Sequence, residues 1–183
     1  MRYEGAGTIE FLYENNNFFF IEMNTRLQVE HPITEAVFGV DLVKEQISVA
    51  SGAGMSFSQE SLKSKGHAIE CRINAERLPT FSPSPGNIKE FHSPGGIGIR
   101  MDSAIYNGFK VPSHYDSLIG KLIVHADSRP MAIKRLARAL DELIIDGIYT
   151  TVDLFKEILD EENFKSGEYN IHWLENWLAD QVR

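Results

Sequence analysis

FIEMNTRLQVEHP, residues 20–32, is the stretch from which a fold and a candidate site can be inferred. Along an extended strand, alternate side chains point to the same face. Strand geometry would therefore place five polar or charged side chains on one face: Glu22, Asn24, Arg26, Gln28 and Glu30. The intervening side chains that can pack on the other face are Ile21, Met23, Leu27 and Val29. A row of charges at strand spacing beside a packing face indicates a reaction surface.

The segment just before this stretch predicts a β-hairpin. Residues 8–14 and 18–24 are rich in aromatic and aliphatic side chains, and three asparagines at 15–17 separate them. Asparagine tolerates left-handed backbone angles and is common in turns. A loop of these three residues would pair Glu14 with Phe18 and would place Glu10 opposite Glu22.

Two glutamates opposed across a hairpin favour a metal site. Their Cβ atoms would be about 4.5–5.5 Å apart, and like charges at that spacing are destabilising. A divalent cation removes the repulsion, and Asn24, next on the same face, adds a neutral oxygen. Mg²⁺ takes such oxygen ligands, usually with substrate phosphates and water completing the shell. For the hairpin taken alone, the alternative is an exposed edge hairpin with solvated acids.

The length of the stretch suggests two separate tasks. Glu22 and Glu30 are eight residues apart, which is about 26 Å in a fully extended strand. The upstream acids therefore suit metal and phosphate, whereas Arg26, Gln28 and Glu30 suit a second substrate. A guanidinium presents a planar fork that matches a carboxylate or bicarbonate, and Glu30 is a candidate general base. The His-Pro pair that follows favours extended backbone, so we expect the strand to end there.

Residues 22–32, EMNTRLQVEHP, resemble the signature of the biotin carboxylases and biotin-dependent carboxylases, which are ATP-grasp ligases. The likeness continues through HAIECRINAE (67–76), PSPG (83–86), YDSLIGKL (115–122) and LIIDGI (143–148). Several ordered blocks covering most of the chain make this resemblance specific. The sequence is similar in particular to the bacterial biotin carboxylases that serve acetyl-CoA carboxylase in fatty acid synthesis.

The resemblance implies a role for each matching residue. Three residues would bind the Mg²⁺ (or Mn²⁺) ions that bridge the phosphates of ATP: Glu10, Glu22 and Asn24. Three would bind bicarbonate: Arg26, Gln28 and, through its backbone, Val29. Glu30 would deprotonate bicarbonate for attack on the γ-phosphate, which gives carboxyphosphate. Arg72 would lie near biotin and stabilise its enolate-like form, so that Glu30, Arg72 and Arg26 are the expected catalytic residues.

The resemblance also implies the domain organisation. We expect an α+β protein in which residues 1–60 are the carboxy-terminal part of an ATP-grasp domain and residues 61–183 are the carboxy-terminal domain of the family. Complete members have a further amino-terminal portion and a Gly-rich lid over the phosphates, and no such Gly-rich element precedes a helix here. We therefore expect a portion that is inactive alone. Its expected partners are the missing amino-terminal portion, a biotin carboxyl carrier protein and a second copy in a homodimer, with Arg100 at the dimer contact.

The composition is that of an ordinary globular chain, with 183 residues of which 43% are hydrophobic and 24% charged. A net charge of −8 argues against a nucleic-acid-binding protein, which would need clustered basic residues. No apolar run approaches the roughly 20 residues that span a bilayer, and we expect a cytoplasmic protein without a membrane segment. The single cysteine, Cys71, excludes an intrachain disulfide, and its alternation with Ile69 and Ile73 predicts a core residue rather than a nucleophile.

The rest of the chain predicts mixed helices and strands. Asp41 is a good N-cap for a helix that runs to about Ser51, and the small and polar residues 52–65 are the best boundary candidate. We expect strands at 66–76, 88–92, 97–102 and 118–126. Ser128 and Pro130 predict a helix start, with an amphipathic helix through Ile145. Two further helices are expected near 151–161 and 171–180.

Several residues have a structural interpretation. Five histidines without metal-ligand spacing are expected to be structural or surface residues: His67, His92, His114, His125 and His172. Trp173 and Trp177, four residues apart, indicate a helix face. Asp116 and Lys121 are expected to support the fold or its contacts.

Three alternatives remain for the function. Another ATP-grasp ligase, such as a carbamoyl-phosphate or purine-pathway enzyme, would share the metal hairpin but not the continuation from Arg26 to Pro32 or the block around Arg72. The parent could also be a pyruvate or acyl-CoA carboxylase. From a different class, the chain could be a non-catalytic module for dimerisation or docking.

Overall fold

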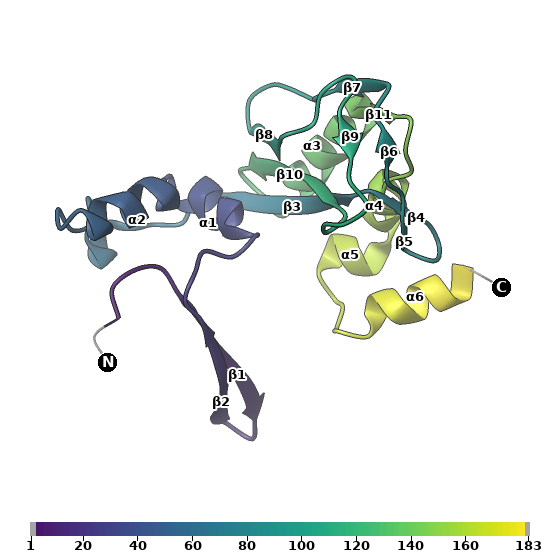
Figure 1. Ribbon diagram of the computed structural model, residues 1–183. Helices are drawn as coiled ribbons and strands as arrows, with labels where there is room; N and C mark the ends of the chain where they lie inside the picture. Colours follow the sequence, from purple (N-terminus) through teal and green to yellow (C-terminus); the bar gives the residue numbers. More distant parts are fainter. Residues whose placement is uncertain (1–2, 182–183) are drawn as a thin grey trace. The chain divides into compact units, whose positions relative to one another are not determined.

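The computed structural model describes residues 3–181, which fall into two compact units, one up to Lys65 and one from Gly66 onward. Each unit contains helices and strands (Figure 1), which confirms the predicted α+β class. None of the helices within the described range has the length and apolar character that a membrane span requires.

The first unit begins with a β-hairpin made of β1 (Thr8–Glu14) and β2 (Asn17–Asn24). Asn15 and Asn16 have φ angles of 51° and 62°, so both occupy the left-handed region that a tight two-residue hairpin turn requires. Because the turn has two residues and not three, Glu14 pairs with Asn17, and the predicted pairing with Phe18 was wrong. A register shift between Glu10 and Phe11 then skips Ile21, as in a β-bulge.

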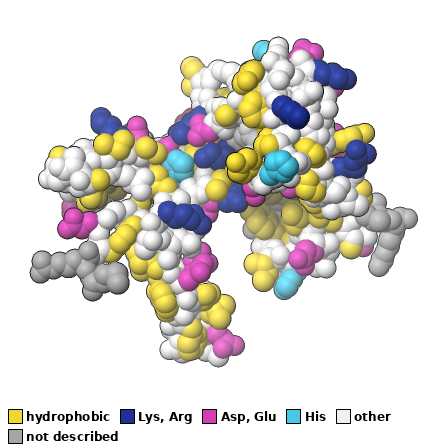
Figure 2. Space-filling view, viewed as in Figure 1, with side chains coloured by type: hydrophobic (Ala, Val, Ile, Leu, Met, Phe, Trp, Pro, Cys, Tyr) yellow, Lys and Arg dark blue, Asp and Glu magenta, His cyan; other side chains and the backbone are white. Residues whose placement is uncertain are grey.

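One face of the hairpin is apolar and exposed. Phe11 pairs with Phe20, and the two ring centroids are 6.1 Å apart, while Phe18 approaches Phe11 at 5.9 Å and Tyr13 at 4.9 Å. Phe18 and Phe20 are 69% and 64% exposed, and hydrophobic side chains are visible along the hairpin in the space-filling view (Figure 2). Contacts between rings rather than burial hold these side chains together.

The chain leaves the sheet at the end of β2. The predicted strand over residues 25–31 was wrong, because residues 25–30 are irregular, with a bend and a turn, and His31 begins helix α1 (His31–Phe38). Pro32 lies in the first turn of α1, where its fixed φ angle suits a helix and its missing N–H costs no hydrogen bond. Helix α2 (Leu42–Ala50) has the predicted N-cap, since the Asp41 carboxylate accepts a 2.8 Å hydrogen bond from the Lys44 N–H. A short 3₁₀ turn, η1 (Gln59–Ser61), completes the helical part.

The second unit is built on an antiparallel sheet of three strands in the order β3-β10-β8. These are β3 (His67–Asn74), β10 (Leu118–Ala126) and β8 (Ile99–Ser103), close to three of the predicted strands. Helix α3 (Arg129–Glu142) packs on one face of this sheet. Alternate residues of the strands form the core beneath the helix, among them Cys71, Ile73, Leu122 and Val124, which pack with Leu136 and Leu140.

Shorter elements surround this core. Two-residue and three-residue strands pair as β4 (Glu76–Arg77) with β5 (Ser82–Pro83), β6 (Gly86–Asn87) with β9 (Lys110–Val111), and β7 (Glu90–His92) with β11 (Ile144–Asp146). The pairing of β11 with β7 ends α3 at Glu142, so the prediction that this helix runs to Ile145 was wrong. Helices α4 (Val152–Asp160) and α6 (Trp173–Gln181) match the last two predicted helices, and α5 (Glu162–Ser166), which was not predicted, lies between them.

Candidate functional site

The base of the hairpin brings two carboxylates and an amide together. Glu10 is the register partner of Glu22, as predicted, because the skipped residue Ile21 compensates for the shorter turn. The amide nitrogen of Asn24 donates to Glu10 Oε1 at 2.8 Å and to Glu22 Oε1 at 3.4 Å. The amide therefore bridges two like charges that would otherwise repel each other across the strands.

The chemistry of these three side chains fits a magnesium ion. Carboxylate oxygens are hard ligands that Mg²⁺ prefers, and a half-turn of the Asn24 amide would present its oxygen in place of its nitrogen. Among residues 3–181, no group of three His, Cys, Asp or Glu side chains is placed to hold a metal ion. Two carboxylates with an amide leave most coordination positions to substrate phosphates and water, which is how Mg²⁺ is usually bound at phosphate-transfer sites.

A small hollow adjoins the base of the hairpin. Its volume is about 150 Å³, and its lining includes the three residues expected to handle the second substrate, Arg26, Gln28 and Glu30. Thr8, the register partner of Asn24, lines the same hollow. Thr8 and Asn24 form one rung of the hairpin, and the Ile9–Met23 rung separates it from the acids Glu10 and Glu22. The hollow therefore borders, through Thr8, the rung from which the Asn24 amide reaches the two acids.

Contacts between side chains and backbone carbonyls of the same loop hold the loop that shapes this hollow. The Arg26 guanidinium donates to the Leu27 carbonyl at 3.2 Å, and the His31 ring nitrogen Nδ1 lies 2.8 Å from the Gln28 carbonyl oxygen. Glu30 is the N-cap residue of α1, and its side chain makes no capping hydrogen bond to the helix. Val29 and Glu30 form the turn that precedes α1.

Arg72 belongs to the second unit. It is an exposed residue of β3, and its backbone carbonyl accepts a 3.3 Å hydrogen bond from the buried Thr151 hydroxyl. Its register partner on β10 is Lys121, which in turn is paired with Asp102 on β8. We did not expect Lys121 and Asp102 to adjoin Arg72, because no sequence pattern reports a register between strands so far apart.

Other titratable groups are used structurally. In the first unit, the buried Glu45 accepts a hydrogen bond from the Ser56 hydroxyl and another from the Ser56 N–H at 2.9 Å, which together lower the pKa of its carboxyl. In the second unit, burial, and to a smaller extent the nearby Arg129, lowers the pKa of His67, whose Nε2 lies 3.3 Å from an Arg129 nitrogen. These groups hold the fold and lie outside the candidate site.

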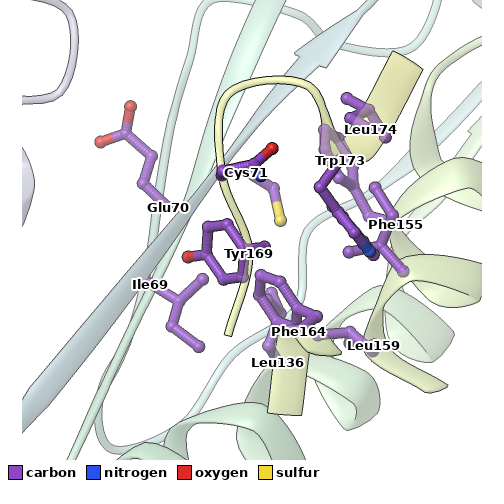
Figure 3. A pocket seen from close by; sticks show the side chains of 12 residues that line it. Ile69, Glu70, Cys71, Leu136, Phe155, Leu159, Phe164, Tyr169, Trp173 and Leu174 are labelled. Carbon is purple, nitrogen blue, oxygen red and sulfur yellow. The ribbon is translucent and has the colours of Figure 1, made fainter. Parts of the chain in front are cut away.

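An apolar cavity of about 310 Å³ lies beside β3 in the second unit. Figure 3 shows the Cys71 sulfur pointing into the space among the labelled aromatic side chains, whereas the Glu70 carboxylate points away from them. Cys71 is 4% exposed, which confirms that it is a core residue. Burial, helped by the charge of Glu70, raises the pKa of its thiol to about 12, so the sulfur is not a nucleophile at neutral pH.

Two family descriptions match the chain. Residues 1–57 match the family "Carbamoyl-phosphate synthase L chain, ATP binding domain", and residues 70–176 match the family "Biotin carboxylase C-terminal domain". The second match covers more than half of the chain. The chain belongs to the biotin carboxylase family. Residues 1–57 thus resemble the ATP-binding domain of carbamoyl-phosphate synthases, whereas residues 70–176 distinguish the chain from those enzymes.

Relatives from this family are closely similar. The biotin carboxylase of Haemophilus influenzae is 60% identical over 177 residues, which are 97% of this chain and 40% of that protein. A pyruvate carboxylase subunit of Methanothermobacter thermautotrophicus is 54% identical over 176 residues, 96% of this chain and 36% of that protein. The chain thus spans about two fifths of the length of the curated relatives it matches.

Solved biotin carboxylase structures share the fold. The biotin carboxylase of Campylobacter jejuni in a β,γ-ATP complex is 49% identical, with a TM-score of 0.89 over 95% of this chain and 39% of that one. The biotin carboxylase domain dimer of Hydrogenobacter thermophilus 2-oxoglutarate carboxylase, in complex with MgADP, ADP and bicarbonate, is 45% identical, with a TM-score of 0.89 over 94% of this chain and 38% of that one.

Proposed function

We propose that this chain is the carboxy-terminal portion of a biotin carboxylase, which uses ATP and bicarbonate to carboxylate biotin on a carrier protein. The observation that carries the proposal is the shared rung at the base of the hairpin. Asn24 bridges the two acids, and its partner Thr8 lines the hollow that also contains Arg26, Gln28 and Glu30. This arrangement supports a metal and phosphate site beside a small oxyanion site, which transfer of a phosphoryl group to bicarbonate would require.

The proposed metal residues would hold the ion that neutralises and aligns the phosphates. Glu10, Glu22 and Asn24 would hold Mg²⁺, which when bound neutralises charge on the ATP phosphates and favours phosphoryl transfer. The two carboxylates lie on facing strands of one rung and would fix the position of the ion, and through it that of the phosphates. Positioning of this kind is most of what phosphoryl transfer asks of a protein.

The proposed bicarbonate site supplies orientation and a base. Arg26 presents its planar fork to two oxygens of bicarbonate, and Gln28 and the backbone of Val29 complete the binding. Glu30 takes the proton of bicarbonate, an oxygen of the resulting carbonate attacks the γ-phosphorus, and ADP leaves, which gives carboxyphosphate. The carboxyl group of carboxyphosphate then passes to the ureido nitrogen of biotin, inorganic phosphate leaves and takes up the N–H proton, and Arg72 would stabilise the enolate-like form of the ureido group.

The proposed activity belongs to a whole enzyme with further parts and partners. The remaining three fifths of a relative's length would supply the amino-terminal portion that completes the ATP site. A biotin carboxyl carrier protein and a second copy of the enzyme are the proposed partners, in a cytoplasmic acetyl-CoA carboxylase. A biotin carboxylase portion of a pyruvate carboxylase is the second candidate, favoured by the 54% identity to the pyruvate carboxylase relative.

The proposal is tested with a chain extended to the full length of the relatives. ADP release is measured with Mg²⁺, bicarbonate and free biotin, omitting each in turn. Release that requires bicarbonate and is stimulated by biotin supports the proposal. Release indifferent to biotin would indicate another ATP-grasp ligase, and no release from a folded chain would indicate an interaction module.

A further inference from the structure

The apolar cavity of the second unit is large enough to hold a small molecule. Its volume is about 310 Å³, and its walls come from β3, α3, α4, α5 and α6. Pockets of about 300–1,000 Å³ with mostly apolar walls are the usual sites for small ligands. An engineered apolar cavity of about 150 Å³ stays dry and binds benzene, so this one has room for about two fused rings.

The cavity has a closed floor and an open mouth. At the floor, Cys71, Leu136 and Leu159 are 4%, 1% and 5% exposed. At the mouth, Tyr169 is 49% exposed and Leu174 on α6 is 37% exposed. A molecule that enters beside Leu174 therefore leaves solvent progressively as it approaches the floor, which is favourable for an apolar molecule.

Aromatic side chains form much of the wall. The rings of Phe164 and Tyr169 are stacked, with an angle of 14° between their planes and centroids 6.0 Å apart. The Trp173 ring lies 5.8 Å from that of Tyr169. These rings and that of Phe155 surround the space into which the Cys71 sulfur points (Figure 3). A planar ring can meet such walls face to face or edge to face, which an aliphatic chain cannot do.

The walls favour a neutral occupant. The lining residues, all within the described range, include no Lys, Arg or His. Their one acid, Glu70, directs its carboxylate away from the aromatic side chains (Figure 3). The Cys71 thiol is neutral at neutral pH, because burial raises its pKa. An ion that entered would lose its hydration without gaining a charged partner among the rings.

We propose that this cavity binds a neutral, planar molecule of about two fused aromatic rings, which packs against the aromatic wall and reaches Cys71 at the floor. Such an occupant would supply the dispersion contacts that side chains facing an empty space lack. The inference does not rest on the proposed function, because none of the residues assigned to metal, bicarbonate or biotin lines the cavity.

Indole is the probe, and the two tryptophans of the chain are the reporters. Trp173 lines the cavity, Trp177 is not among the lining residues, and the aromatic hairpin of the first unit contains no tryptophan. In the ¹⁵N-labelled 183-residue chain, unlabelled indole is expected to shift the Trp173 Nε1–H signal saturably, with a Kd of about 0.1–1 mM, and to shift the Trp177 signal less. A Trp173 signal that stays in place, or that moves linearly without saturating, would overturn the proposal.

Variants that add a ring test where indole binds. Ile69→Phe and Leu174→Phe enlarge side chains that line the cavity, one on β3 and one on α6, and each should raise the Kd by about tenfold or more. Met131→Phe, at an exposed position on α3 that does not line the cavity, is the matched control and should leave the Kd unchanged. An unchanged Kd in all three variants would contradict the proposed location.

A second measurement needs no variant and does not depend on how a variant folds. In the parent chain at saturating indole, nuclear Overhauser effects are expected between the indole protons and the side chains of Phe155 and Cys71. Their absence would place indole outside the cavity and overturn the proposal.

Two other probes test the class of ligand. An indole carboxylate should bind about tenfold or more weakly than indole, because its charge is not matched, and equal affinity would contradict a neutral site. Octanol should also bind more weakly, and tighter binding of octanol would indicate a site for an aliphatic chain. Indole binding should persist in a chain extended to the length of the relatives. Its loss there would mean that another part of the protein fills the cavity, and it would overturn the proposal.

Discussion

The side-chain amide of Asn24 donates a 2.8 Å hydrogen bond to Glu10 across the two strands of the hairpin. This contact holds a carboxylate that faces a second one, Glu22, in the same rung. The amide offsets part of the repulsion that a metal ion would remove, so the three proposed metal residues are held close together before any ion binds.

Removal of one acid should weaken metal binding without weakening the fold. In the extended chain, Glu22→Gln is expected to raise the Mg²⁺ concentration for half-maximal ADP release by about tenfold or more. The free energy of unfolding should stay the same or rise by up to about 1 kcal/mol, because two like charges no longer face each other. Glu14→Gln, an acid at the other end of β1, is the control. An equal Mg²⁺ requirement in both variants would speak against the metal site.

The shape of the Arg26 side chain should matter beyond its charge. Arg26→Lys keeps the positive charge but loses the planar fork, so the KM for bicarbonate is expected to rise about tenfold to a hundredfold while the KM for MgATP changes little. Steady-state kinetics with each substrate varied in turn measure this split. Parallel rises in both KM values would show that Arg26 does not bind bicarbonate selectively.

His67 should make stability fall on mild acidification. Burial and the nearby Arg129 lower the pKa of His67 below its ordinary value of about 6.5. As the pH falls through that value, the unfolded chain binds the proton before the folded chain does, so stability decreases. Denaturation curves between about pH 7.5 and 5 should show this decrease, and His67→Gln should reduce it. A decrease that His67→Gln leaves unchanged would contradict this assignment.

Cys71 should be chemically silent in the folded chain. Its side chain is 4% exposed and its pKa is raised to about 12. At pH 8 almost no thiolate is therefore present to react with a thiol reagent. We expect no labelling under native conditions and one label per chain in denaturant. Labelling of the native chain within minutes would show that β3 opens readily or that the cavity beside it admits reagents.

The hairpin was predictable because its signals are local. The asparagine run marks the turn, and the aromatic strands on each side mark the pairing. The predicted turn was one residue too long, and the predicted register was wrong at Glu14. Glu10 still faces Glu22 because the skipped Ile21 shifts the strands by one residue, a compensation that the sequence pattern does not reveal.

Residues 25–30 show the limit of alternation as a signal. Polar and apolar side chains alternate here, yet the chain bends, because Pro32 suits the first turn of a helix as well as it ends a strand. The estimate of about 26 Å between Glu22 and Glu30 assumed full extension and does not apply to a bent chain. The bend is what brings Arg26, Gln28 and Glu30 around one hollow.

The pairing of Arg72 with Lys121 lay beyond sequence reasoning for a different reason. The two residues are 49 positions apart in the chain, and their register is set by the core rung of Cys71 and Leu122 beneath α3. Local patterns report which residues share a face of one strand, but they do not report which strand lies beside it.

The most direct test of the central claim follows the oxygen atoms of bicarbonate. In the extended chain with MgATP and biotin, bicarbonate labelled with ¹⁸O should transfer one labelled oxygen to the inorganic phosphate released, detected by ³¹P NMR. Glu30→Gln should abolish this product while the chain still binds MgATP. Released phosphate without label would mean that water and not bicarbonate attacks the γ-phosphate, and it would contradict the proposed carboxylase chemistry.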